Sequence, residues 1–350
     1  MRNTRLTQRL TALLIGTQLA AGCSRFVWHE DPFTPDQAPV SETIAAGHDT
    51  TYVLKGPSYY LLSNERSALW NRDVMEDVAW RYHALFGDAP PTIAVRLDTS
   101  RAPAAAVDST TTWRGVPFAT VAMRRRSTVA PGRKQTERDR DIDANDSLRV
   151  RMLSGPMLAA TAAETWLKAR TLDATRVSDS QPGGPTHTVI ASATMPAWIE
   201  AGSLRILGSA GAPDRANAEL RADAKHIVPL ATLFTVAWSA RPNAAEIVRP
   251  GISRFGLDDE GNWQDMAAAR ARQRRDEAPG ASPLFIAQSV SVLAFIHERD
   301  PGLVSRLTDE LSRGASIPDV LASSATLPHD LAGLDAAWRD WLKRGQRISR

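Results

Sequence analysis

The sequence predicts an α+β fold, in which a small N-terminal mixed β-sheet with one packed helix precedes a mostly α-helical part. Up to residue 123, short apolar runs alternate with polar residues at a period of two, which is typical of strands, and one stretch has helical periodicity. Beyond residue 155, the apolar residues recur mainly at helical spacing.

The predicted sheet begins near Thr50. Residues 52–54 and 59–62 flank Gly56-Pro57 and predict a hairpin or two short strands. A helix that ends at Gly87 follows, because four apolar residues recur on one face: Val74, Val78, Tyr82 and Leu85. Further strands are predicted at 93–97, 116–122 and 148–152.

Residues 124–146 carry seven basic and five acidic side chains with almost nothing apolar. Such a segment cannot offset the entropy of ordering by burial, so we expect a mobile surface loop. The alternative is a contact for phosphate headgroups through Arg124, Arg125 and Arg126.

The second part of the chain is predicted to form helices. They are expected at 157–170, 195–207, 284–298, 302–313 and 316–321, with a terminal one striped by Leu331, Leu334, Trp338, Trp341 and Leu342. Residues 243–282 are expected to be irregular, with a basic helical piece at 266–275 on the surface.

The first residues have the three-part layout of an export signal. Three arginines precede an apolar stretch at 10–19, which is too short to span a bilayer, and small residues follow. The run Leu19-Ala20-Ala21-Gly22-Cys23 resembles the lipobox that signal peptidase II cleaves. We therefore expect a bacterial lipoprotein anchored to a membrane by acyl chains such as palmitate on Cys23, its only cysteine. The alternative is an ordinary cleaved signal followed by a free cysteine.

Ser24 after the cysteine favours the outer membrane, facing the periplasm, over retention in the inner membrane. Removing the three signal arginines from the 42 basic residues leaves 39, which equals the 39 acidic residues, so no nucleic-acid partner is expected. The predicted segments are a signal peptide (1–22), the lipidated cysteine with its tether (23–49), an N-terminal α/β part (50–123), the charged loop (124–147) and the helical part (148–350).

Three segments of the helical part share a pattern with a known family. They are Pro196-Ala197-Trp198-Ile199-Glu200-Ala201-Gly202, Ile286-Ala287-Gln288-Ser289, and Ala337-Trp338 followed by Trp341-Leu342. With the order of elements, they resemble the gluzincin metallopeptidases, specifically the peptidase MA-like group, over roughly residues 50–342. In that group an HExxH helix supplies two zinc-binding histidines, and the Pro-x-Trp helix supplies a glutamate as the third ligand.

The resemblance places hydrocarbon side chains at all three ligand positions. Aligned on Glu164, the HExxH run reads Ala163-Glu164-Thr165-Trp166-Leu167, so Ala163 and Leu167 replace the histidines, and Ala201 replaces the glutamate. Alanine and leucine have no lone pair for zinc, so no metal and no cofactor are expected.

Glu164 remains at the position of the general base. It is expected to be a remnant that is solvated or paired with an arginine, or else a polar group of a binding cleft. Trp166, Trp198 and Glu200 are the candidate residues of that cleft, between the 157–170 helix and the helix opened by Pro196. Core packing is the alternative for Trp198, and Glu200 is also explained as a first-turn acid favoured by the helix dipole.

No other catalytic motif is complete. No two histidines lie at ligand spacing, and His297-Glu298 is followed by Asp300 and Pro301 where a second histidine should come. The sequence thus predicts a pseudo-metallopeptidase that binds a peptide or an envelope protein, or serves as a scaffold. The alternatives are a hydrolase that uses Glu164 with an unrecognised metal or none, and a structural lipoprotein that spaces two partners.

Overall fold

The computed structural model describes residues 40–46, 49–99, 112–123, 136, 154–171, 195–238, 244–248, 255–257, 263–265 and 282–344. They belong to one compact unit, Pro39–Arg350. The predicted signal peptide, Cys23, the strand expected at 148–152 and nearly all of the charged loop lie outside the described residues. No helix within the described ranges is long and apolar enough to cross a membrane.

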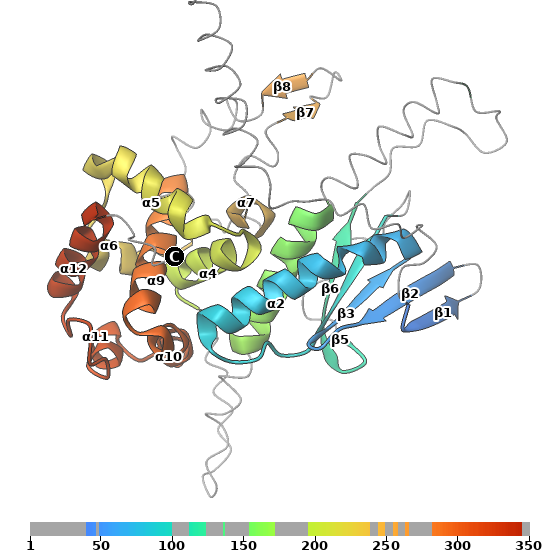
Figure 1. The fold of residues 1–350 in the computed structure, drawn as a ribbon, viewed down its shortest axis with the longest axis horizontal. Helices are drawn as coiled ribbons and strands as arrows, with labels where there is room; N and C mark the ends of the chain where they lie inside the picture. The colour runs from blue at the N-terminus through green and yellow to red at the C-terminus, as the bar shows by residue number, and fades with distance from the viewer. Residues whose placement is uncertain are drawn as a thin grey trace, which may run out of the picture. The chain divides into compact units, whose positions relative to one another are not determined.

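The N-terminal part is a six-stranded mixed sheet in the order β1-β2-β3-β4-β6-β5 (Figure 1). Its strands are β1 (Glu42–Ala46), β2 (Asp49–Lys55), β3 (Tyr59–Ser63), β4 (Ile93–Asp98), β5 (Thr112–Trp113) and β6 (Val116–Ala122). The pairs β3-β4 and β4-β6 are parallel, and the remaining pairs are antiparallel. The predicted hairpin and the strands at 93–97 and 116–122 are confirmed.

The sheet begins at Glu42, earlier than the predicted start near Thr50. Strand β1 pairs with β2 over its whole length, so the segment assigned to the tether contributes the edge of the sheet. Its sequence, ETIAA, has one large apolar side chain, Ile44, and therefore lacks the alternation that predicts a strand.

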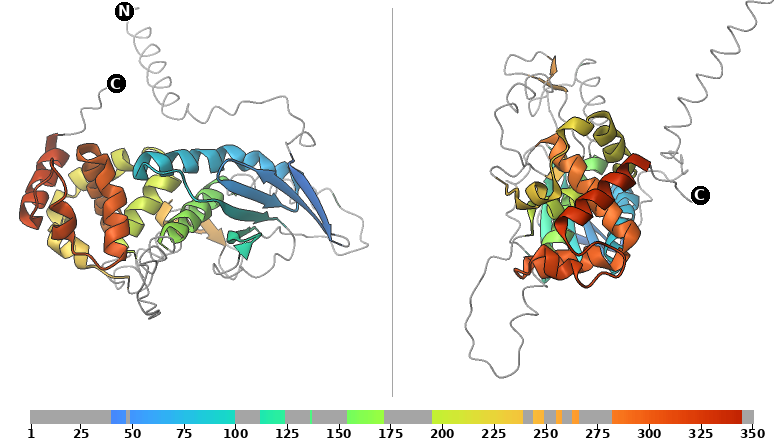
Figure 2. Two further views of the ribbon diagram at one scale, coloured as in Figure 1. Left: turned by 90° about the horizontal axis from the view of Figure 1, so that it is seen from below. Right: turned by 90° about the vertical axis from the view of Figure 1, so that its left-hand side faces the viewer.

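Helix α2 (Arg72–Phe86) connects the parallel strands β3 and β4 and follows the short 3-10 helix η2 (Arg66–Asn71). Parallel neighbours need such a crossover, and Figures 1 and 2 show α2 running along one side of the sheet. Its buried face includes Val78 and Tyr82, and it ends at Gly87, whose φ of 78° is the left-handed conformation of a helix C-cap. The prediction for this helix is confirmed.

The other side of the sheet has its own small core of Val53, Leu62 and Ala94, with Ile44, Tyr60, Trp113, Val116 and Phe118 packed around it. The sheet is curled toward this side, because its two edges approach each other. Arg114, in the β5–β6 turn, donates two hydrogen bonds of 2.7 and 2.8 Å to the carboxylate of Glu42 in β1. We call this the concave side.

The second part is helical, which confirms the α+β class. Its first helix spans residues 154–171. The others are α4 (Ala197–Gly208), α5 (Ala212–Ala222), η3 (Ala224–His226), α6 (Leu230–Thr235), α7 (Ala244–Val248), α9 (Pro283–Arg299), α10 (Pro301–Ser312), α11 (Ile317–Leu321) and α12 (Leu331–Arg344). Within the segment expected to be irregular, β7 (Phe255–Leu257) and β8 (Trp263–Asp265) form an antiparallel pair.

Helix α9 is the buried centre of the helical part. A methyl group added at Gly202 of α4 would lie 2.6 Å from Leu293 Cδ1 and 2.9 Å from the carbonyl oxygen of Ser289, so only glycine allows α4 and α9 to approach this closely. On another side, Trp338 of α12 donates through Nε1 to Ser291 Oγ at 3.0 Å. The three segments that carry the family pattern therefore meet around one helix.

Arg170, near the end of the 154–171 helix, joins the sheet part to the helical part. Its guanidinium binds both carboxylate oxygens of Asp309 in α10, at 2.9 and 2.8 Å, and Asp88 after α2 at 3.2 Å. It also donates to Ser305 and Tyr82 and lies 4.6 Å from the centre of the Phe86 ring. Its side chain is only 8% exposed, so this network replaces most of its hydration.

Candidate functional site

The three predicted ligand positions are closed inside the protein. Ala163 and Leu167 lie on the 154–171 helix and are 0% and 3% exposed, and Ala201 on α4 is 0% exposed. Each is a hydrocarbon side chain surrounded by protein, so none of them faces water or offers a donor atom. A zinc ion at these positions would lack ligands and would also have to displace packed atoms.

Glu164 forms an ion pair within its own helix. Its carboxylate lies 2.9 Å from the ammonium of Lys168, one turn later, and its side chain is 22% exposed. The sequence predicted that Glu164 is solvated, paired with an arginine, or a polar group of a binding cleft. The structure shows this pair with a lysine, and Glu164 takes part in a further interaction as well. A carboxylate in an ion pair at the surface is a weak general base without a metal to activate water.

Glu200 has a more specific role than a first-turn acid. Its carboxylate accepts a hydrogen bond of 2.7 Å from the indole Nε1 of Trp238, 38 residues later. Trp238 in turn contacts the Phe285 ring edge-on, with ring centres 5.7 Å apart. No short-range pattern predicts this contact, because the two residues are brought together only by the packing of α4, α6 and α9.

Trp166 and Trp198 are core residues and do not line an open cleft. Both are 0% exposed. Trp166 donates through Nε1 to the carbonyl oxygen of Pro91 at 2.8 Å, which ties the 154–171 helix to the start of β4. Trp198 packs against Phe234 with the rings tilted by 37° and their centres 4.5 Å apart. Both side chains are in the core because burying a large aromatic ring is more favourable than leaving it exposed for a ligand to stack on.

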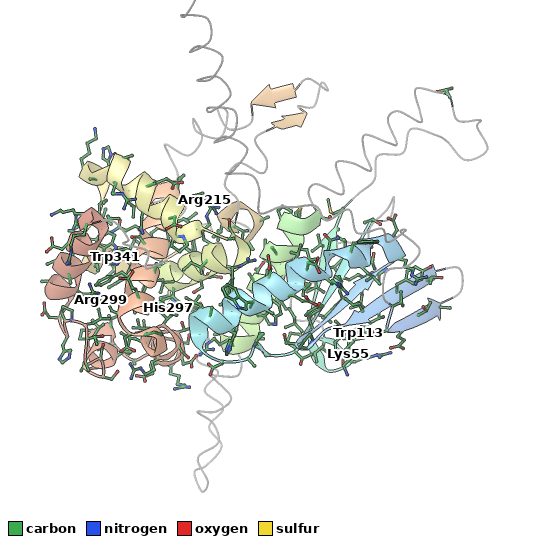
Figure 3. The ribbon with its side chains drawn as sticks, in the orientation of Figure 1. Lys55, Trp113, Arg215, His297, Arg299 and Trp341 are labelled. Atoms are coloured by element: carbon green, nitrogen blue, oxygen red, sulfur yellow. The ribbon has the colours of Figure 1, made fainter. Side chains whose placement is uncertain are left out.

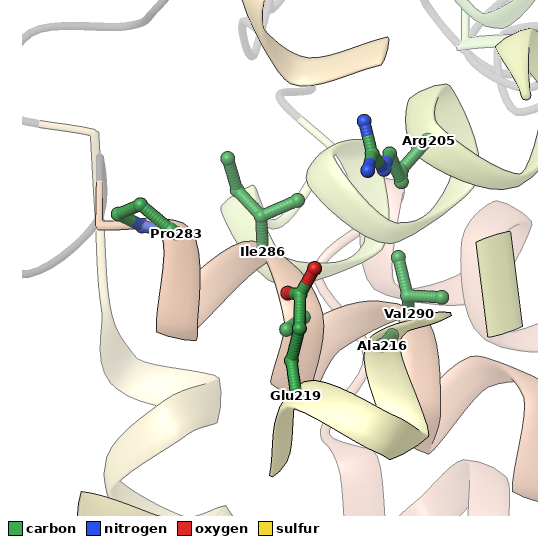
Figure 4. Close-up of a pocket in the computed structure, with 7 residues that line it drawn as sticks. Arg205, Ala216, Glu219, Pro283, Ile286 and Val290 are labelled. Atoms are coloured by element: carbon green, nitrogen blue, oxygen red, sulfur yellow. The ribbon is translucent and has the colours of Figure 1, made fainter. Parts of the chain in front are cut away.

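A small pocket lies elsewhere, between α4, α5 and α9 (Figure 4). Its volume is about 150 Å³, below the range of roughly 300–1,000 Å³ that is usual for ligand sites. Ile286 and Val290 of α9 line it, flanked by Arg205 of α4 and Glu219 of α5. Burial lowers the pKa of Arg205, whose guanidinium donates to the carbonyl of Val248. The guanidinium of Arg205 is thus used in a contact with the end of α7.

Comparison of the chain with protein families, with curated proteins and with solved structures gives no match. The peptidase resemblance stays a prediction from the motifs. Among the described residues, no group of three or more His, Cys, Asp or Glu side chains is placed to hold a metal ion.

His297, the start of the incomplete zinc motif, is half-buried near the end of α9 (Figure 3). Burial lowers the pKa of its imidazole, which a hydrogen bond to the backbone of Pro301 opposes, and among the described residues its buried Nδ1 atom has no hydrogen-bond partner. The folded protein therefore favours a neutral ring and binds a proton less readily than the unfolded chain does.

This difference predicts a pH dependence of stability. As pH falls through the ordinary imidazole value of about 6.5, the unfolded chain takes up a proton that the folded ring resists, so the free energy of unfolding decreases. Below the lowered pKa the ring is protonated in both the folded and the unfolded state, so stability falls no further through this residue. Urea denaturation between pH 8 and pH 5 should show that the wild type loses more stability than His297→Gln. Parallel losses in the two proteins would contradict this prediction.

Proposed function

We propose that the chain is a membrane-anchored lipoprotein of the cell envelope whose peptidase-like part binds a peptide or protein partner, or acts as a scaffold, without catalysis. The observation that carries the proposal is the closure of the ligand positions. Ala163, Leu167 and Ala201 are hydrocarbon and at most 3% exposed. The residual Glu164 is paired with Lys168 at the surface. Together, these features remove the ligands, the space and the free base that zinc-dependent hydrolysis requires.

The meeting of the three motif segments around α9 supports the peptidase resemblance in a second way. Gly202 provides the close approach of α4, Gln288 binds the backbone of Val228 through both ends of its amide, and Trp338 anchors α12. These contacts give the motif residues a packing role that needs no metal, since they hold the helices together.

The decisive experiment measures zinc content and peptide hydrolysis in the purified full-length chain. We expect at most about one zinc ion per ten protein molecules. We also expect no chelator-sensitive hydrolysis of a mixed peptide library. Glu164→Gln tests whether any hydrolysis depends on the candidate base. Lys168→Gln, on the same helix, is its matched control. Stoichiometric zinc, or hydrolysis that Glu164→Gln abolishes and Lys168→Gln leaves intact, would favour the hydrolase alternative.

The anchor is tested separately. Cells fed radiolabelled palmitate should label the wild-type chain and leave Cys23→Ser unlabelled, and fractionation should place the labelled chain in the outer membrane. A wild-type chain that stays unlabelled would support the ordinary secretion signal followed by a free cysteine.

A further inference from the structure

We draw no further inference here: the strongest candidate, the small pocket between α4, α5 and α9, borders the end of α7 and the start of α9, where the chain passes into residues that the structure does not describe, so nothing in the structure shows what covers it.

Discussion

Replacing Arg170 by Met is expected to lower the free energy of unfolding by about 3–5 kcal/mol, as is typical when one partner of a buried ion pair is removed. The substitution preserves most of the side-chain volume but leaves Asp309, whose side chain is 27% exposed, without its bidentate partner. It also removes the donors to Tyr82, Ser305 and Asp88. Because these groups belong to α2, α10 and the loop after α2, the loss should loosen the contact between the two parts of the fold. Urea denaturation measures the effect.

Arg72→Met is the matched control for this prediction. Arg72 pairs with Asp73 at the surface, with 48% and 81% of the two side chains exposed. Its loss should change stability by less than about 0.5 kcal/mol, because such exposed pairs contribute little. Equal effects of the two substitutions would show that the Arg170 network does not join the parts of the fold.

Ala201→Glu, which places a glutamate at the position that the resemblance aligns with the third zinc ligand, is expected to destabilise the protein by about 3–5 kcal/mol. Ala201 is 0% exposed, so the new carboxylate would be buried without a partner and would also overpack α4. Burial should raise the pKa of the new carboxyl, so the loss should grow as pH rises through that pKa. Thermal and urea denaturation at pH 5 and pH 8 would measure both effects.

Ala218→Glu provides the comparison, since Ala218 is exposed on the neighbouring helix α5. It should change stability by less than about 0.5 kcal/mol. If Ala201→Glu is tolerated equally well, or if added zinc stabilises it, position 201 is an open ligand site and the closure on which the proposed function rests is disproved.

Local patterns predicted the elements in which large apolar residues at regular spacing, or a capping residue, mark the buried face or the end of the element. Helix α2 was predicted because Val74, Val78, Tyr82 and Leu85 recur at helical spacing and a glycine, Gly87, follows them. The structure shows that Gly87 adopts the left-handed conformation of a C-cap. The start of α11 was predicted at Ser316, whose hydroxyl accepts from the Asp319 amide at 3.3 Å. Helix α5 was missed because its buried face is made mostly of small side chains, such as Ala212 and Ala216, which give no apolar stripe.

The sequence by itself determined that the three positions which the resemblance aligns with zinc ligands are hydrocarbon, since the side chains of Ala163, Leu167 and Ala201 offer no donor atom in any fold. Only the tertiary structure decided that these positions are closed and that Trp166 and Trp198 are core residues. The physical reason is that burial and pairing depend on residues distant in the chain, and strand register and helix packing determine which of them meet.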